Sequence, residues 1–384
     1  MKILWVNPSF LDYRVPVYKG LFDLNKANFF LLYSKKRVPE RVITKIENAI
    51  AHNAIGLTGE TILYFSGSSE FANSDLRLPY QKGLYKAIAK VNADILIGEG
   101  FFQWTPMALL YAKLHRKMFF IAYERTAHTE RNCPKWRSLY RKFISFFVDG
   151  YLVNGILTKE YLLQMRVSEK KIFIGGMSAD SENLAKNVTT CTIKERQTLK
   201  TQLSINNGLT FLYVGRINEP KGVFCLLNAW RYHIKNYPTD SLIIIGTGPL
   251  YEQYAAEFSA FKSIKICGAV DYDTIYLYYV IADVFVMPTL EDNWSLVVSE
   301  AMACGLPIAC SIYNGCYPEL VHDSINGKRF DPFNELDFIE TLAYFHKVNL
   351  KEFGQESISI EKKFGSDIVS ENIFKACNEI YRNG

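Results

Sequence analysis

Short runs of apolar residues recur along the chain, and longer segments with helical periodicity separate them. Six runs rich in β-branched and aromatic residues occur early, at 2–6, 28–33, 94–98, 118–123, 150–154 and 171–176. Six more follow at 210–215, 241–246, 264–268, 283–288, 307–311 and 327–330. Continuous apolar runs spaced by helices are typical of buried strands in parallel sheets built from βαβ units. The pattern therefore predicts an α/β protein with two similar, doubly wound, Rossmann-like domains.

The stretch from residue 180 to 207 is polar and contains no strand candidate. We place the domain boundary there, with a first domain at 1–188 and a second at 189–365. The last segment, about 366–384, predicts a helix with Ser366 as its N-cap. Its apolar face would consist of Val369, Ile373, Ala376, Cys377 and Ile380. We expect this helix to pack back on the first domain.

Composition narrows the class of protein. The chain has 49% hydrophobic and 22% charged residues, as globular proteins do. Residues 1–190 hold 27 Lys and Arg against 16 Asp and Glu, and the rest hold 17 against 23. A basic first half indicates an anionic partner, such as a phosphate-bearing ligand, nucleic acid or a membrane surface, or else ordinary solvated Lys and Arg.

Two further features concern location. No uninterrupted apolar run reaches the ~18 residues that span a bilayer. The eight cysteines include no C-x-x-C pair and no His partner at zinc spacing. Together these features predict a cytoplasmic protein with reduced cysteines, either soluble or peripheral to the inner face of the cell membrane.

Two turns that follow strands carry candidate anion-binding chemistry. The strand near 210 ends at Gly215, and Arg216 and Lys221 lie between it and the next helix. In a parallel sheet this edge binds ligands, and a helix N-terminus favours anions. The alternative is that Arg216 caps a turn and Lys221 is solvated. The Gly-x-Gly at 246–248 is either a ligand-approach site or simply a tight turn.

A third turn carries acids ahead of an apolar helix. Glu291 and Asp292 lie in the loop after the strand at 283–288, and Glu300 lies in a helix that should end at Gly305. A buried carboxylate needs hydrogen-bond donors, and a vicinal diol such as that of ribose supplies two. A core glutamate satisfied within the protein is the other interpretation.

Four stretches together resemble glycosyltransferase family 4. They are "VGRINEPKG" (214–222), "IIIGTGPL" (243–250), "EDNWSLVVSEAMACGLPIACS" (291–311) and "NGCYPELVHDSINGKRFDP" (314–332). Members of this family are retaining enzymes that use nucleotide sugars. They have the GT-B fold, in which two Rossmann-like domains face a central cleft, and the resemblance implies this fold here.

The resemblance also implies roles for residues of the second domain. Arg216 and Lys221 would bind the donor diphosphate, and Glu300 the ribose hydroxyls. Asp292 takes the position of an acid that approaches the transferred sugar; the family has glutamate there, and Glu291 directly precedes it. The loop would offer backbone N–H groups to the phosphates and the sugar, from Asn293, Trp294, Ser295, Leu296 and Val297. The shortened acid leaves the identity of the sugar open.

The first domain resembles the family less. The family has a Gly-rich loop after the first strand, whereas residues 7–18 contain no glycine. There, Tyr13 and Arg14 would contact the acceptor, or Arg14 would anchor a buried turn. Family members place a His near a strand end, facing the transferred sugar. His128 is the candidate, with Glu124 as a rival because it lies nearer the strand end, and a surface role is the alternative for either residue.

Residues 133–147 predict an amphipathic helix with a basic rim. Its apolar stripe would consist of Trp136, Leu139, Tyr140, Phe143, Ile144 and Phe147, with Lys135, Arg137, Arg141 and Lys142 alongside. A core-facing helix is the commoner form of such a stripe. The alternative is a helix that lies in an anionic membrane interface and presents the enzyme to a lipid-linked acceptor.

The resemblance, taken with these features, implies a retaining hexosyltransferase that moves a sugar from a UDP- or GDP-sugar to a glycan or lipid-linked glycan. Assembly of cell-surface polysaccharide or lipopolysaccharide, such as O-antigen or capsule, is the setting suggested by analogy. No D-x-D motif stands in a suitable loop, so we expect no metal and no other cofactor. Alternatives are a nucleotide-sugar epimerase or phosphorylase of the same fold, and a non-catalytic basic binding protein. No nucleic-acid recognition motif is present, and we expect no nucleic acid partner.

Overall fold

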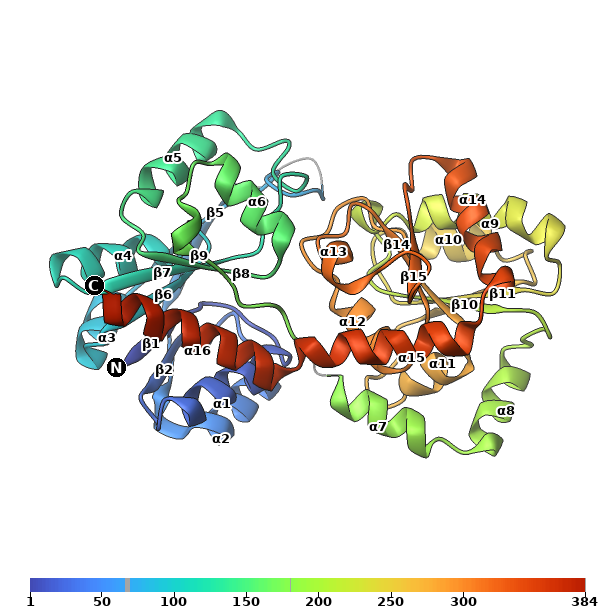
Figure 1. Cartoon of the computed structure of the whole chain (residues 1–384), viewed down its shortest axis with the longest axis horizontal. Coiled ribbons are helices and arrows are strands. Elements are labelled where there is room, and N and C mark those ends of the chain that lie inside the picture. Colours follow the sequence, from blue (N-terminus) through green and yellow to red (C-terminus); the bar gives the residue numbers. More distant parts are fainter. Residues whose placement is uncertain (66–69, 180, 384) are drawn as a thin grey trace. The chain divides into compact units, whose positions relative to one another are not determined.

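The computed structural model describes residues 1–65, 70–179 and 181–383 (Figure 1). The chain divides into two compact units, residues 1–178 with 364–384, and residues 179–363. The sequence analysis placed the division at 188/189. The structure places it earlier because α7 (Glu182–Thr190) packs on α11 (Tyr276–Ile281) and α12 (Leu296–Ala303) of the second unit.

The first unit is built on a seven-stranded parallel sheet in the order β3-β2-β1-β6-β7-β8-β9. Its strands are β1 Ile3–Val6, β2 Phe29–Ser34, β3 Ala54–Leu57, β6 Ile95–Glu99, β7 Met118–Tyr123, β8 Gly150–Val153 and β9 Ile172–Ile174. All six runs predicted in this half form strands. The prediction omitted β3, a half-buried edge strand of only four residues.

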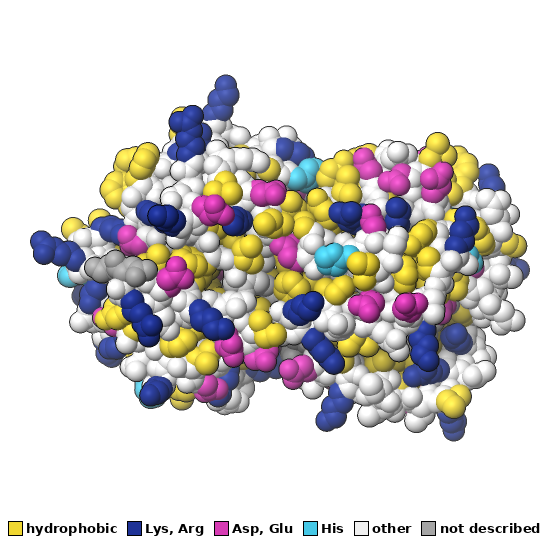
Figure 2. Space-filling view, viewed as in Figure 1, with side chains coloured by type: hydrophobic (Ala, Val, Ile, Leu, Met, Phe, Trp, Pro, Cys, Tyr) yellow, Lys and Arg dark blue, Asp and Glu magenta, His cyan; other side chains and the backbone are white. Residues whose placement is uncertain are grey.

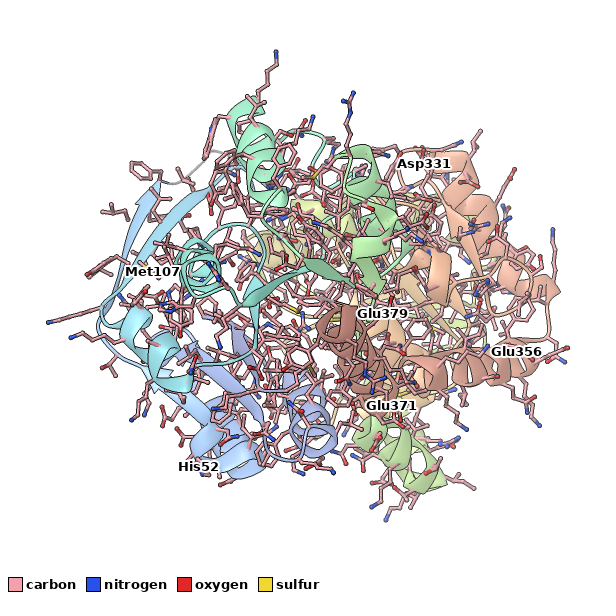
Figure 3. The ribbon with its side chains drawn as sticks, turned by 60° about the vertical axis from the view of Figure 1, so that its left-hand side comes forward. His52, Met107, Asp331, Glu356, Glu371 and Glu379 are labelled. Carbon is pink, nitrogen blue, oxygen red and sulfur yellow. The ribbon has the colours of Figure 1, made fainter. Side chains whose placement is uncertain are left out.

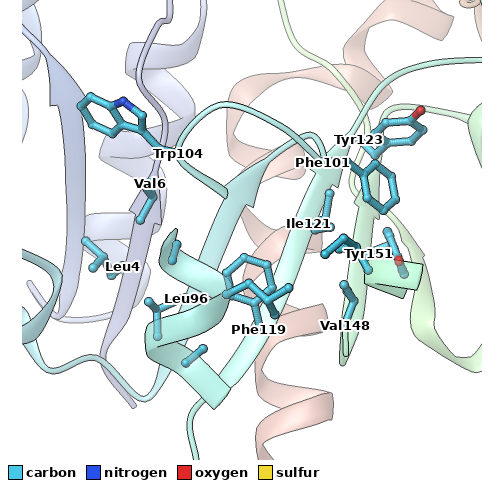
Figure 4. Packing of buried hydrophobic residues seen from close by; sticks show 14 of the residues in the cluster. Leu4, Val6, Leu96, Phe101, Trp104, Phe119, Ile121, Tyr123, Val148 and Tyr151 are labelled. Carbon is cyan, nitrogen blue, oxygen red and sulfur yellow. The ribbon is translucent and has the colours of Figure 1, made fainter. Parts of the chain in front are cut away.

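Helices cover both faces of this sheet. They are α1 Arg14–Leu24, α2 Glu40–Ile50, α3 Leu84–Val91, α4 Thr105–Leu114, α5 Lys135–Ser145, α6 Ile156–Gln164 and α16 Ser366–Asn383, with the 3-10 turns η1 Ala51–Asn53 and η2 Glu169–Lys171. Successive strand side chains point to opposite faces, so Leu4 and Val6 enter one buried cluster and Ile3 and Trp5 enter the other. Figure 4 shows the first cluster, which also contains Phe119.

The C-terminal helix α16 completes the second of these clusters. Val369, Ile373 and Cys377 are buried there against the sheet. Gly20 of α1 faces Ser370, where a Cβ would lie 2.4 Å from the serine Oγ. The missing side chain therefore lets α1 and α16 approach closely, and the helix packs within the first unit.

The first unit also contains an unpredicted antiparallel ribbon, the β4–β5 ribbon, formed by β4 Glu60–Phe65 and β5 Leu76–Gln81. Its two strands form a sheet of their own. Apolar and polar residues alternate in β5, which has no continuous apolar run, whereas β4 ends in a run of four apolar residues that the prediction omitted.

The second unit is built on a six-stranded parallel sheet in the order β12-β11-β10-β13-β14-β15. Its strands are β10 Thr210–Val214, β11 Ser241–Ile245, β12 Ile264–Gly268, β13 Val284–Met287, β14 Ile308–Ser311 and β15 Gly327–Phe330. The remaining helices are α8 Ile193–Gln202, α9 Val223–Asn236, α10 Tyr251–Glu257, α13 Tyr317–Leu320, α14 Glu335–Tyr344 and α15 Leu350–Glu361, with η3 Glu219–Lys221, η4 Phe345–Lys347 and η5 Lys362–Phe364. The predicted α/β architecture of two Rossmann-like units is confirmed.

Each sheet has one point at which the direction of strand order reverses. In the first unit this point lies between β1 and β6, and in the second it lies between β10 and β13. The connections that follow these strands diverge to opposite faces, and ligands of doubly wound folds bind in the resulting crevice at the carboxyl ends. The two reversal points therefore direct attention to the loops after β1, β6, β10 and β13.

Candidate functional site

The loop after β10 is anchored to the loop after β13 through the backbone of Pro220. Its carbonyl oxygen accepts hydrogen bonds from the N–H of Leu290 at 2.8 Å and from the Thr289 hydroxyl at 2.8 Å. Gly222 follows with a φ of +66°, and a Cβ there would lie 2.0 Å from the Pro288 carbonyl oxygen. Only glycine suits both the conformation and the close approach. Lys221 is thereby held beside the acidic loop.

This anchoring brings Lys221 and Asp292 together. The Lys221 ammonium forms an ion pair with Asp292 Oδ2, and the Ser295 hydroxyl donates to the same oxygen. The N–H of Trp294 donates to Oδ1 at 3.2 Å. Burial alone would raise the pKa of Asp292, but these three donors outweigh it and hold the pKa below its usual value. Asp292 is therefore an ionised carboxylate at the reversal point of the second unit.

The loop from Asn293 to Ser295 is fixed by a second neighbour, the loop after β14. Ser295 donates its N–H to the Asn314 side chain at 3.3 Å. A Cβ on Gly315 would lie 1.9 Å from the Asn293 carbonyl oxygen, so the two loops are in backbone contact. Trp294 and Ser295 are buried. Two of the N–H groups predicted to face the donor, those of Trp294 and Ser295, thus bond inside the protein in this structure.

Glu300 lies in α12, which starts with Leu296 and Val297 and ends before Gly305, as predicted. Gly305 has a φ of +81°, and its N–H bonds to the Met302 carbonyl. The Glu300 carboxylate accepts a hydrogen bond from the Tyr279 hydroxyl at 3.1 Å. Tyr279 is buried in α11, and burial, followed by the charge of Glu300, raises its pKa well above the usual value. The sequence held no signal for this tyrosine.

Arg216 follows β10 after Gly215 and is exposed, and its carbonyl oxygen accepts a hydrogen bond from the Tyr213 hydroxyl at 2.8 Å. The Gly-x-Gly turn lies next to it. A Cβ on Gly246 would lie 1.9 Å from the Gly215 carbonyl oxygen, and one on Gly248 would lie 2.2 Å from that of Ile217. Backbone packing between neighbouring turns explains both glycines without a ligand.

The reversal point of the first unit holds a second ion cluster, centred on Arg14. This arginine starts α1 and is buried; it forms an ion pair with Glu124, which follows β7, and lies 3.5 Å from Glu99, which ends β6. Trp5 of β1 donates its indole N–H to Glu99 at 2.9 Å. Arg14 therefore has the anchoring role that the sequence analysis weighed against acceptor contact, and it brings two acids together.

Glu99 is a residue that the sequence analysis missed. The pKa of Glu99 is raised to about 7, mainly by burial and also by the nearby charge of Glu124, while Arg14 and the hydrogen bond from Trp5 oppose the shift. A carboxyl group with such a pKa exchanges protons near neutral pH. The signal was its position, since Glu99 is the only charged residue in the run "DILIGE" after the leading aspartate and falls at the strand's carboxyl end.

Tyr13 and His128, two further candidates, lie close in sequence to members of this cluster. Tyr13 precedes α1 next to Arg14, and burial is the main cause of its raised pKa. His128 is half-buried in a loop that Thr126 and Thr129 stabilise by mutual side chain–backbone hydrogen bonds. The structure joins Glu124, the rival of His128, to Arg14. A pocket of about 20 Å³, large enough for about one water molecule, adjoins Arg14 and Glu124.

Comparisons with known proteins bear on the second unit first. Residues 208–347 match the family model of the glycosyl transferases group 1. The matched residues include the Lys221–Asp292 pair and Glu300. The alpha-monoglucosyldiacylglycerol synthase of Acholeplasma laidlawii is 34% identical over 180 residues, which cover 43% of this chain and 45% of that protein. The lipopolysaccharide 1,2-N-acetylglucosaminetransferase of Salmonella typhimurium is 30% identical over 141 residues, covering 34% and 37%.

The chain spans less than half the length of these curated relatives in the matched regions.

Solved structures are similar to the chain over both units. Anabaena HepE in complex with UDP superposes with a TM-score of 0.76 at 13% identity, covering 99% of this chain and all of that one. The lipopolysaccharide outer core galactosyltransferase WaaB gives 0.69 at 15% identity, covering 99% of each chain. The chain has the GT-B fold.

The helix α5 differs from the core-facing helix that its stripe suggested. Five large apolar side chains along the helix and just after its end are exposed: Trp136, Leu139, Phe143, Phe146 and Phe147, here called the α5 ridge. Arg137 and Arg141, expected on a basic rim, are buried instead. Arg141 pairs with the buried Glu130, and Arg137 donates to the Asp75 carbonyl at 2.6 Å. Of the predicted stripe, Ile144 is buried in the core and Tyr140 packs against it, while the rest is exposed. Polar partners inside the unit thus turn the arginines inward and the α5 ridge outward.

Among the described residues, one group of side chains has metal-ligand chemistry. His233, Asp240 and His346 place their donor atoms within 4.8 Å of one another. Both histidine Nε2 atoms lie next to Asp240 Oδ2, at 2.8 and 2.7 Å, and Asp240 Oδ1 accepts the Leu209 N–H. Asp240 precedes β11, at the amino edge of the sheet, away from Lys221. Hydrogen bonds account for this arrangement.

Proposed function

We propose that this protein is a retaining glycosyltransferase that moves a sugar from a nucleoside diphosphate, UDP or GDP, to an acceptor hydroxyl. The observation that carries the proposal is the position of Lys221. It stands at the reversal point of a domain that matches group 1 glycosyltransferases, where doubly wound folds bind ligands. HepE, which shares the fold, was crystallised with UDP and with UDP-glucose.

The diphosphate would be stabilised by cations of the chain. Lys221 and the exposed Arg216 both follow β10, and Asp292 in the neighbouring loop forms an ion pair with Lys221. As the bond to the sugar breaks, negative charge accumulates on the departing diphosphate, and prepositioned cations stabilise it. We propose that these residues replace a divalent metal, and that a diphosphate oxygen takes the acceptor's proton on the same face, which retains the anomeric configuration.

The acceptor is proposed to be a lipid or lipid-linked glycan of the cell surface. The relatives include an alpha-monoglucosyldiacylglycerol synthase and a lipopolysaccharide 1,2-N-acetylglucosaminetransferase. No helix among the described residues is long and apolar enough to cross a membrane. The α5 ridge, within the predicted segment 133–147, offers a peripheral contact instead. All eight cysteines are free thiols, which favours the cytoplasmic face of the membrane.

The proposal is tested by a donor screen. UDP- or GDP-sugars should raise the melting temperature, because a ligand at a hundredfold its Kd adds about 2.7 kcal/mol. Transfer with the matching donor should continue in EDTA, and NMR of the product should show the donor's anomeric configuration. Loss of activity in EDTA would contradict the metal-independent proposal, and an inverted product would contradict retention. Turnover without any acceptor would instead favour an epimerase.

Glu300→Gln should weaken UDP or GDP binding about tenfold, because charge-assisted hydrogen bonds to the ribose contribute about 1.5–3 kcal/mol. The Tyr279 hydroxyl can still donate to the glutamine, so unfolding should change little. Calorimetric titration with the nucleoside diphosphate measures this effect. The matched control is the 2′-deoxynucleotide, which should lose affinity for the wild type but much less for the variant. Equal affinity of both proteins for the ribonucleotide would refute the ribose contact.

A further inference from the structure

The β4–β5 ribbon exposes a continuous apolar face. In its register Leu63 lies opposite Leu78, and Phe65 and Tyr80 lie on the same face because side chains alternate along each strand. These four side chains are 66%, 45%, 58% and 66% exposed, in that order. Figure 3 shows the two strands of the ribbon at the edge of their unit. An isolated two-stranded ribbon is only marginally stable in water, and exposed apolar patches commonly mark interaction sites. We therefore expect this face to bind a partner.

The base of the ribbon is firmly attached to the first unit. Glu60, the first residue of β4, is buried and accepts hydrogen bonds from Ser34 at 2.8 Å and Trp104 at 2.9 Å. Arg37 lies 3.5 Å from the same carboxylate. The exposed apolar face therefore belongs to a ribbon held in place at its base.

The other attachment of the ribbon leads to α5. Arg137 of α5 donates to the backbone carbonyls of Asn73 and Asp75, just before β5, at 3.0 and 2.6 Å. The Asn73 amide donates to Glu130 at 3.2 Å, and Glu130 pairs with Arg141. The arginines that turn the α5 ridge outward thus also hold the ribbon. One buried polar cluster fixes both apolar surfaces.

We propose that the β4–β5 ribbon and the α5 ridge together form one docking surface for an anionic lipid bilayer. An anionic bilayer suits this surface because aromatic side chains gather at the membrane interface and exposed lysines beside them attract anionic headgroups. Exposed cations accompany it: Lys135 and Lys142 on α5, and Lys82 directly after β5. In Figure 2, hydrophobic side chains over α5 lie beside Lys and Arg. This inference rests on the proposed function, since the docked enzyme would meet a lipid-linked acceptor.

The ribbon is tested by the double variant Leu63→Ser/Leu78→Ser in the full chain. Its binding to vesicles of phosphatidylcholine with phosphatidylglycerol should weaken about tenfold or more in co-sedimentation, because buried apolar area and charge both set membrane affinity. The matched control is Ile193→Ser/Leu336→Ser, two apolar residues of the second unit that are more exposed than Leu63 and Leu78. This control should bind like the wild type. Melting temperature and nucleoside diphosphate affinity should stay unchanged in both.

A second variant keeps the test independent of the ribbon's folding. Lys135→Glu/Lys142→Glu should abolish the preference for anionic over pure phosphatidylcholine vesicles. Wild-type vesicle binding by the ribbon variant, or no binding by the wild type at low salt, would overturn the inference. A wild-type dimer that the ribbon variant dissociates would assign the surface to a second copy of the chain. Sugar transfer to a water-soluble acceptor would survive all these outcomes, so the proposed function is judged separately.

Discussion

Lys221→Ala should lower kcat/KM for sugar transfer by about a hundredfold or more, since removal of one preorganised charge-stabilising group typically has this effect. It should also destabilise the second unit by about 1–3 kcal/mol at neutral pH, because Asp292 loses its cation and keeps only the Ser295 and Trp294 donors. Initial rates with the donor found in the screen, and urea unfolding, measure the two effects.

The two effects of Lys221 can be separated by a double variant. Lys221→Ala/Asp292→Asn removes the unpaired charge and should recover most of the stability, while transfer stays low because the cation is still missing. The depressed pKa of Asp292 fixes the pH dependence: its stabilisation is present above the unfolded pKa of about 3.9 and is lost as pH falls through the lower folded value. The loss of unfolding free energy caused by Lys221→Ala should therefore become smaller at acidic pH. Recovery of transfer in the double variant would contradict the diphosphate role.

Glu99→Gln should flatten the pH dependence of stability in the first unit. The folded pKa of Glu99, about 7, lies above the unfolded value, so the folded state binds the extra proton between them. Stability from this group is complete below about pH 4.3 and is lost as pH rises through the folded value. The glutamine variant cannot ionise, so its free energy of unfolding should not fall over this range. Between pH 5 and pH 8 the free energy of unfolding of the variant should therefore rise relative to that of the wild type by about 2–3 kcal/mol.

Urea unfolding followed by tryptophan fluorescence across this pH range measures the Glu99 effect, and Trp5 lies next to the residue. The matched control is Asp23→Asn, an exposed carboxylate of the same unit that should leave the pH profile unchanged. A Glu99→Gln profile parallel to that of the wild type would show that Glu99 is ionised throughout. The Arg14 guanidinium would then outweigh burial.

Some contacts among the candidate site residues follow from the sequence, and others do not. Asp292 and Lys221 lie far apart in the chain, yet both follow buried strands, and the carboxyl ends of neighbouring parallel strands meet at one edge. Their proximity was therefore predictable. The pairing of Arg14 with Glu124 and Glu99 was not, because α1 places the arginine by its packing, and no spacing in the sequence encodes that contact.

The helix α5 shows the same limit more sharply. Its periodicity correctly indicated two unlike faces, one aromatic and one basic, but periodicity cannot say which face is inside. Arg137 and Arg141 lie inside because Glu130 and the backbone carbonyls near Asn73 meet them there. Those partners come from segments about 10 and 60 residues away in the chain, which only tertiary packing brings together.

The sequence by itself determined the two parallel sheets, the helix stop at Gly305 and the edge at which a ligand would bind. Each follows from local rules, namely apolar runs that must be buried, left-handed backbone that glycine adopts, and strands that share one direction. The tertiary structure alone decided which charges are neutralised, which carboxyl holds its proton near neutral pH and which apolar faces remain exposed. These depend on the desolvation and proximity of groups distant in sequence, and both arise only when the chain is folded.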